Sequence, residues 1–227
     1  DTWATSSLTP QIVGRRLSDP ALFRRVFPMA LRPQAHEIIR TWAFYTIVRA
    51  HYHDGALPWA NVAISGWGLS PDGTQKLSKS RGDGPIGALE ALDTYSADAV
   101  RYWAAGTGLG KDTIISEERI ATGGKWATKL WNVARFAERF LDGYAPTAAP
   151  PAGLTTADRW LLARLARLIA AATAAFDAYD YATARGEVEA FFWRDLADNY
   201  IEMAKQRLYE GGAGYEAARY TLHQALL

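Results

Sequence analysis

The segment Lys76-Leu-Ser-Lys-Ser-Arg-Gly82 combines side chains that could bind a polyphosphate. It carries two lysines, Lys76 and Lys79, and two hydroxyls, Ser78 and Ser80. A lysine ammonium is a compact, mobile charge that can follow negative charge as it moves between phosphates. Serine hydroxyls and backbone N–H groups add directed donors, and a glycine lets the backbone come close to a ligand. The segment therefore predicts a loop that folds over a triphosphate, with a solvated basic turn as the alternative.

The residues around this loop predict the elements that position it. A helix is expected over 36–53, where Ile39, Trp42, Tyr45/Thr46 and Arg49 recur at helical spacing. Leu57-Pro-Trp59 ends it, and residues 61–67 are typical of a short buried strand. The other expected elements are a turn at Pro71-Asp-Gly73, a helix over 88–95, and a helix over 97–104 with Ser96 as its N-cap.

The second half of the chain is expected to be wholly helical. Ser116 should cap a helix with acidic residues in its first turn. Thr155 and Asp158 have the spacing of a capping box, which predicts a helix to about Tyr179. Residues 143–153 form a connector, and further helices are expected over 182–209 and from about Tyr215 onward. Together these elements predict a helical bundle.

Composition excludes several classes of protein. The chain has 227 residues, is 49% hydrophobic and carries a net charge of +1, so it is globular, and any contact with RNA must come from local patches rather than from its net charge. It has no cysteine, which excludes disulfides and is compatible with a reducing cytoplasm. Its four histidines lack the spacing of a metal site, and no apolar stretch is long enough to span a membrane. Asp1 at the start and an unfinished helix at the end favour a fragment.

Segments in a fixed order resemble class I aminoacyl-tRNA synthetases, and among them the family specific for valine. The loop is similar to the KMSKS signature, with Leu77 in place of methionine. The other matching segments are Asp1-Thr-Trp-Ala-Thr-Ser-Ser7, Arg32-Pro-Gln-Ala-His-Glu-Ile-Ile-Arg-Thr-Trp42, Ser65-Gly66, Ser116-Glu-Glu-Arg119 and Lys129-Leu-Trp-Asn132. Five ordered matches are more specific than the loop alone.

The resemblance implies a fold and an activity. The fold would be α/β over residues 1–110, as the second half of a Rossmann-type nucleotide-binding domain. An all-α anticodon-binding bundle, cut short at its C-terminus, would follow over 111–227. The complete protein would use ATP with Mg²⁺ to activate valine as valyl-adenylate and would transfer it to tRNA(Val). It would be a cytoplasmic monomer with no protein-bound metal, and these 227 residues alone would be inactive.

The same resemblance implies roles for individual residues. Lys76 and Lys79 would be catalytic. The ATP-binding residues would be Gln34, Ala35, Glu37, Gly66, Ser78, Lys79 and Ser80. Trp3, Ile38 and Trp42 would bind the amino acid, with ordinary core packing as the alternative. The tRNA-binding residues would be Lys125, Lys129, Trp131, Asn132 and Arg135, with a buried Trp131 and solvated lysines as the alternative.

Two other functions fit the sequence. Ala35 and Asp83 depart from the family pattern, in which glycine and asparagine are usual, and favour a catalytically inactive paralogue or a tRNA-binding module. Isoleucine and leucine enzymes share the architecture, so a class I synthetase for one of those amino acids is the second alternative. An unrelated helical interaction domain would not explain the ordered matches.

Overall fold

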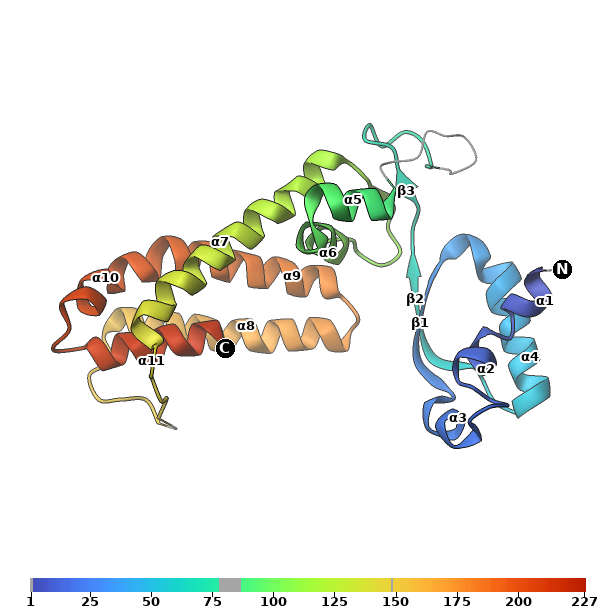
Figure 1. Cartoon of the computed structure of the whole chain (residues 1–227), viewed down its shortest axis with the longest axis horizontal. Helices are drawn as coiled ribbons and strands as arrows, with labels where there is room; N and C mark the ends of the chain where they lie inside the picture. Colours follow the sequence, from blue (N-terminus) through green and yellow to red (C-terminus); the bar gives the residue numbers. More distant parts are fainter. Residues whose placement is uncertain (1, 78–86, 148) are drawn as a thin grey trace. The chain divides into compact units, whose positions relative to one another are not determined.

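The computed structural model describes residues 2–77, 87–147 and 149–227 (Figure 1). The chain divides into two compact units. The first comprises Asp1–Gly84 and Leu109–Ile115, and the second comprises Pro85–Gly108 and Ser116–Leu227. The three residues predicted to bind phosphate from the loop, Ser78, Lys79 and Ser80, lie outside the described residues.

The first unit contains two short parallel strand pairs with helices around them. Its strands are β1 (Met29–Ala35), β2 (Trp59–Ser65), β3 (Gly68–Leu69) and β4 (Thr113–Ile114). β1 pairs with β2, from Met29 opposite Trp59 to Ala35 opposite Ser65, and β3 pairs with β4. Its helices are α1 (Thr2–Ser6), α2 (Thr9–Val13), α3 (Pro20–Val26), the 3₁₀ helix η1 (His36–Ile38), the π-helix η2 (Ile39–Ala43) and α4 (Phe44–Asp54).

The connection from β1 to β2 is a helical crossover, as parallel strands require. The predicted helix over 36–53 is confirmed as the continuous run η1, η2 and α4. Its buried face carries Trp42, Thr46 and Ala50, so Trp42 and Thr46 of the expected face are buried, whereas Ile39 and Tyr45 are exposed. The π-helical turn at Ile39–Ala43 explains this difference, because it shifts the positions that follow around the helix axis.

The core of the first unit is small. Trp42 stacks on Trp59 with the ring centroids 5.5 Å apart, and Ala43, Met29 and Ile38 pack around this pair. β2 was predicted to be a buried strand, and this is wrong for most of its length, since Asn61 and Val62 are exposed. In the described part of the chain β1 is the one strand that pairs with β2, and the backbone N–H of Gly110 donates a further hydrogen bond of 2.8 Å to the Ile64 oxygen of β2.

The second unit is helical. Its elements are α5 (Ala88–Tyr95), α6 (Ala97–Ala105), α7 (Glu117–Leu141), α8 (Thr156–Asp177), α9 (Tyr181–Ala190), the π-helix η4 (Phe191–Tyr200), α10 (Ile201–Glu210) and α11 (Tyr215–Leu226). α9, η4 and α10 follow one another without a break and form the single helix predicted over 182–209 (Figure 1). The predicted caps are confirmed, because Ser96 and Ser116 accept hydrogen bonds from the N–H groups of Ala99 and Arg119.

The bundle core contains a buried ionic network. The fully buried residues of this core include Leu161, Leu196, Tyr200 and Leu222. The predicted capping box is present, since Thr155 and Asp158 exchange side chain to backbone hydrogen bonds. Asp158 is itself fully buried and also accepts hydrogen bonds from Arg207 of α10 and from the Tyr200 hydroxyl. The start of α8 is thereby fixed to α10 and η4.

The described ranges contain neither a candidate membrane-spanning helix nor a candidate metal site. None of the helices there is both long and apolar enough to cross a membrane. No group of three or more histidine, aspartate or glutamate side chains in the same part of the chain could hold a metal ion.

Candidate nucleotide site and candidate RNA-binding surfaces

The carboxyl ends of β1 and β2 bring together residues that are far apart in sequence. Ala35 and Ser65 are the last paired residues, so His36-Glu37 and Gly66-Trp67 follow at the same edge of the strand pair. The His36 and Trp67 rings lie 4.9 Å apart, and His36 Nδ1 is 3.2 Å from the carbonyl oxygen of Ser65. In open α/β sheets ligands bind outside the carboxyl ends of the strands. This edge is therefore the candidate nucleotide site.

Glu37 is the centre of this site. Its Oε2 accepts a hydrogen bond of 3.1 Å from Trp67 Nε1 and another from the Lys76 ammonium group. The same ammonium lies 4.9 Å from the centroid of a Trp67 ring. The hydrogen bond from Lys76 is the main reason that the pKa of Glu37 lies below its usual range. We call Glu37, Trp67 and Lys76 the strand-edge cluster.

The strand-edge cluster is open to solvent and suited to a polar ligand. The Glu37 and Lys76 side chains are 43% and 40% exposed, so a ligand can reach both. An ionised carboxylate accepts hydrogen bonds from hydroxyl groups, and an ammonium group binds phosphate oxygens. Lys76 is the first lysine of the loop predicted to cover a triphosphate, and the structure brings it into contact with Glu37, a residue predicted to bind ATP.

Gln34 and Ala35 support this edge from within β1. Gln34 is buried, and its Oε1 has no hydrogen-bond partner among the described residues. The backbone oxygen of Gln34 accepts a hydrogen bond of 3.4 Å from Ser65 Oγ, which adds a link between the strand ends. Ala35 is half-buried as the last residue of β1. Both predicted ATP-binding residues therefore lie beside or beneath the cluster.

The structure gives Gly66 a packing reason to be glycine. A Cβ at this position would lie 2.3 Å from the backbone oxygen of Lys111 and 2.6 Å from the backbone nitrogen of Asp112. Asp112 Oδ1 also accepts a hydrogen bond of 2.8 Å from the backbone N–H of Trp67. The segment before β4 therefore packs directly on Gly66 and positions Trp67 for its bond to Glu37.

Gly66→Ala is expected to lower the free energy of unfolding of the complete protein by about 1–3 kcal/mol, because backbone rather than a flexible side chain must move. Gly124→Ala is the control, since nothing lies within 4 Å of a Cβ there and alanine favours the helix. Urea unfolding curves of both variants measure the difference. A Gly66→Ala protein as stable as the Gly124→Ala protein would show that the close approach carries no cost.

The residues predicted to bind the amino acid do not line one hollow. Trp42 is 6% exposed, stacks on Trp59, and donates a hydrogen bond of 3.0 Å from Nε1 to the Ser6 oxygen. Ile38 packs against the same pair. Trp3 lines a hollow of about 350 Å³ with Ala4, Ser7, Tyr45, Val48 and Arg49. Ile38 and Trp42 thus pack in the core, whereas Trp3 lines a hollow.

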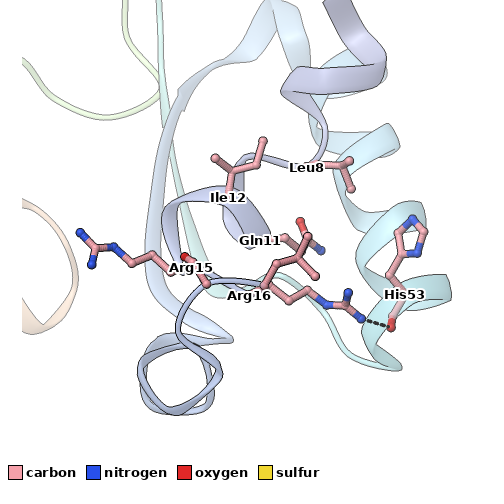
Figure 2. Close-up of a pocket in the computed structure, with 8 residues that line it drawn as sticks. Leu8, Gln11, Ile12, Arg15, Arg16 and His53 are labelled. Carbon is pink, nitrogen blue, oxygen red and sulfur yellow. Dashed lines mark hydrogen bonds between the residues drawn. The ribbon is translucent and has the colours of Figure 1, made fainter.

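A second hollow in the first unit was not predicted from sequence. It measures about 290 Å³ and is lined by Leu8, Gln11, Ile12, Arg15, Arg16, Leu17, Ser18 and His53 (Figure 2). Arg16 bonds the His53 oxygen at 3.1 Å and the Asp54 carboxylate at 2.6 Å. Asp54 Oδ2 also accepts from Gln11 Nε2. These contacts join α2 to the end of α4, a link between distant segments that no local pattern indicates.

The residues predicted to bind tRNA lie along α7. Lys125, Trp131, Asn132 and Arg135 are exposed, and Trp131 keeps 65% of its surface accessible. The alternative of a buried Trp131 is therefore wrong. Lys129 differs from the others, because it pairs with Asp198 at 3.1 Å and lies 5.0 Å from the Trp193 ring centroid. It connects α7 to η4, whereas the other four are accessible to a partner.

Comparison with known proteins defines the class. Residues 1–116 match the family model described as tRNA synthetases class I (I, L, M and V), and residues 158–227 match the anticodon-binding domain of tRNA ligase. The chain belongs to the class I tRNA synthetase family. It is 45% identical to the valine–tRNA ligase of Anaplasma marginale (strain St. Maries), covering 100% of this chain and 28% of that protein. It is 50% identical to the valine–tRNA ligase of Thermobifida fusca (strain YX), and the match covers 92% of this chain and 23% of that protein.

Solved structures confirm the predicted fold class. The chain matches the Agrobacterium radiobacter K84 agnB2 LeuRS, solved in a ternary complex with tRNA and LeuAMS, with a TM-score of 0.76 at 15% identity, covering 100% of this chain and 29% of that one. It matches Mycobacterium tuberculosis methionyl-tRNA synthetase bound by methionyl-adenylate with a TM-score of 0.65 at 25% identity. This match covers 94% of this chain and 41% of that one. The chain thus has the Rossmann-like part and the helical bundle of this class, and spans 23–28% of the two valine–tRNA ligases above.

Proposed function

We propose that the protein containing this chain is a valine–tRNA ligase, which activates valine with ATP and transfers it to tRNA(Val). Identity of 45–50% to valine–tRNA ligases across nearly the whole chain supports this specificity. The observation that carries the chemistry is the strand-edge cluster, in which Glu37 binds Lys76 of the KMSKS-like loop at the carboxyl ends of two parallel strands. The isoleucine, leucine and methionine enzymes share the family model, so identity to relatives carries the choice of valine.

In the proposed reaction, a carboxylate oxygen of valine forms a bond to the α-phosphorus of ATP. The bond from that phosphorus to the bridging oxygen breaks, so the products are valyl-adenylate and pyrophosphate. The ATP carries Mg²⁺ as part of the substrate. No covalent enzyme intermediate is needed, so the residues act by positioning and by stabilising charge.

The residues divide between the two substrates of this step. Glu37 accepts hydrogen bonds from the ribose hydroxyls, beside Gln34, Ala35 and Gly66. Lys76, Lys79, Ser78 and Ser80 bind the phosphates, and Lys79 stabilises the departing pyrophosphate. Trp3 contacts valine, while Ile38 and Trp42 shape the site from the core behind it.

The two parts of the chain have different roles in the complete protein. Residues 1–110 contribute to the catalytic domain and 111–227 to the anticodon-binding domain; the family models that support this division match residues 1–116 and 158–227. The complete protein acts in the cytoplasm as a monomer. On α7, the exposed Lys125, Trp131, Asn132 and Arg135 contact tRNA, and Lys129 holds the helix in place beside them.

Glu37→Gln is expected to raise the KM for ATP about tenfold, because glutamine lacks the charge that both binds Lys76 and strengthens a hydrogen bond to a hydroxyl. The measurement is the rate of pyrophosphate exchange against ATP concentration in the complete protein. Glu138→Gln is the matched control, since Glu138 is exposed on α7 and its carboxylate has no partner among the described residues. An unchanged KM for ATP in the Glu37 variant would exclude the ribose contact.

The proposed function as a whole is tested by aminoacylation. The complete protein is expected to attach radiolabelled valine to tRNA(Val) in the presence of ATP, and to leave leucine and isoleucine uncharged. Charging of a different tRNA with its own amino acid would show that the specificity is wrong.

A further inference from the structure

Three arginines line a trough between α8 and η4. Arg164 and Arg167 come from α8, and Arg194 comes from η4. They line a hollow of about 460 Å³ together with Trp160, Ala163 and Asp195. The same three arginines also line a second hollow of about 130 Å³ between α8 and the continuous helix formed by α9 and η4. We call this surface the arginine trough.

A buried carboxylate orients two of the three guanidinium groups. Asp195 is 3% exposed and accepts hydrogen bonds from the Nε atoms of Arg164 and Arg194, at 2.8 and 2.9 Å. Burial alone would raise the pKa of Asp195, but the two arginines outweigh it and hold the pKa below its usual range. The terminal nitrogens of Arg164 and Arg194 have no acceptor among the described residues. Those nitrogens are donors left available in the trough.

The charges in the trough do not balance. In the larger hollow the three guanidinium groups face the single carboxylate of Asp195, and Glu187 joins the lining of the smaller one. Arg167 is exposed and has no ion-pair or hydrogen-bond partner within the described ranges. Positive charge therefore remains in excess, and a net positive trough attracts anions.

We propose that the arginine trough binds the phosphodiester backbone of an RNA, at a place separate from the residues on α7. A guanidinium group presents its donors in a planar fork that matches phosphate oxygens. The arginines are spread over two helices and two hollows, which suits consecutive phosphates better than one small anion. Trp160 is 36% exposed at the same hollow and offers a flat surface to a sugar or base.

This inference rests on the proposed function, since the RNA would be tRNA. The trough begins within the segment that matches an anticodon-binding domain, residues 158–227. Backbone contacts position an RNA and carry no sequence information. The trough should therefore add affinity and salt dependence without changing which tRNA is preferred.

The test uses Arg167→Ala in the complete protein, because the Arg167 side chain makes no hydrogen bond or ion pair with the other described residues. Binding of a tRNA(Val) transcript is measured by fluorescence anisotropy at several salt concentrations. Loss of one phosphate contact should weaken binding about tenfold at low salt and reduce the slope of log K against log salt by about 0.7–0.9. Arg101→Ala is the control, since Arg101 is an exposed arginine of α6 outside the trough. Valine-dependent pyrophosphate exchange should not change, because that step involves no tRNA.

Each outcome decides a different point. If Arg167→Ala and Arg101→Ala proteins bind with the same slope and affinity, the trough is not an RNA site and the proposed function stands. If the slope falls but the wild-type protein has no valine-dependent exchange, the trough stands and the proposed enzyme activity is wrong. If the wild-type protein binds no tRNA, both are wrong.

Discussion

Replacing Lys79 with alanine is expected to lower valine-dependent pyrophosphate exchange by about two to three orders of magnitude, the usual cost of removing one donor that acts in a transition state. The reason is the charge that moves onto pyrophosphate as it leaves. Lys79 is the second lysine of the KMSKS-like loop. Lys76, the first lysine, lies at the strand edge with Glu37.

The kinetic pattern separates this role from simple binding. A group that acts mainly in the transition state lowers kcat and kcat/KM together, whereas a group that only binds substrate raises KM. Lys79→Ala should therefore leave the KM for valine nearly unchanged. Lys205→Ala is the control, because Lys205 lies on α10 and pairs with Glu202 of the same helix. A loss of less than tenfold in the Lys79 variant would contradict the role.

Asp158→Ala is expected to lower the free energy of unfolding of the helical unit by about 3–5 kcal/mol, the usual cost of removing one partner of a buried ion pair. Arg207 makes two hydrogen bonds of 2.9 Å to the Asp158 carboxylate, and Tyr200 makes a third of 2.7 Å. Both partners are largely buried, so the substitution would leave the Arg207 charge without its carboxylate partner and the Tyr200 hydroxyl with the Ala218 oxygen at 3.5 Å.

The measurement is chemical denaturation of the complete protein followed by circular dichroism of the helices. Asp177→Ala is a matched control from the same helix, since Asp177 is exposed at the end of α8 and its side chain has no partner in the part of the chain described. That change should alter the free energy of unfolding by less than about 0.5 kcal/mol. Equal effects of the two substitutions would show that the buried network does not stabilise the bundle.

The same network predicts a direction of pH dependence. Burial would raise the pKa of Asp158, but the hydrogen bonds from Arg207, Thr155 and Tyr200 outweigh burial and hold the pKa below its usual value. A carboxyl with a lowered pKa in the folded state stabilises the fold above its unfolded pKa of about 4. That stability is lost as the pH falls from about 4 through the lower folded value. In Asp158→Ala this part of the acid sensitivity should be absent.

Local patterns predicted much of the helical architecture. Ser96, Ser116 and the Thr155–Asp158 pair each form the predicted cap, because a cap depends on residues within one helical turn. The loop of Pro71-Asp-Gly73 is likewise a turn, with Gly73 at a φ of +74° and its N–H bonded to the Ser70 oxygen. These features need no knowledge of the rest of the fold.

Contacts between distant segments could not be predicted in this way. The sequence singled out Asp158 for its cap, but Arg207 lies 49 residues further along, and no spacing rule connects them. Trp67 was expected at the end of a strand, and its bond to Glu37 follows only from the parallel register of β1 and β2. Trp42 was predicted as a wall of the amino-acid site with core packing as the alternative, and its stacking on Trp59, which lies 17 residues further along, follows from no local pattern.

Charged helix surfaces were the least informative part of the sequence. Arg164 and Arg167 lie on an Ala-rich helix and resemble any solvated face. The structure distinguishes Arg164 from such a face, because the buried Asp195 carboxylate of η4 orients the Arg164 guanidinium next to that of Arg194. On α7 the two lysines share one face, but Lys129 pairs with Asp198 while Lys125 is left exposed. Which charges are available to RNA depends on packing between helices.

We infer that the complete protein activates valine at the strand edge described above. Amino-acid-dependent exchange of radiolabelled pyrophosphate into ATP tests it most directly, with valine, isoleucine and leucine each supplied alone. We expect exchange with valine well above that with the other two, and its loss in the Lys79→Ala protein. Exchange with isoleucine or leucine alone, or no exchange with any of the three, would contradict the account.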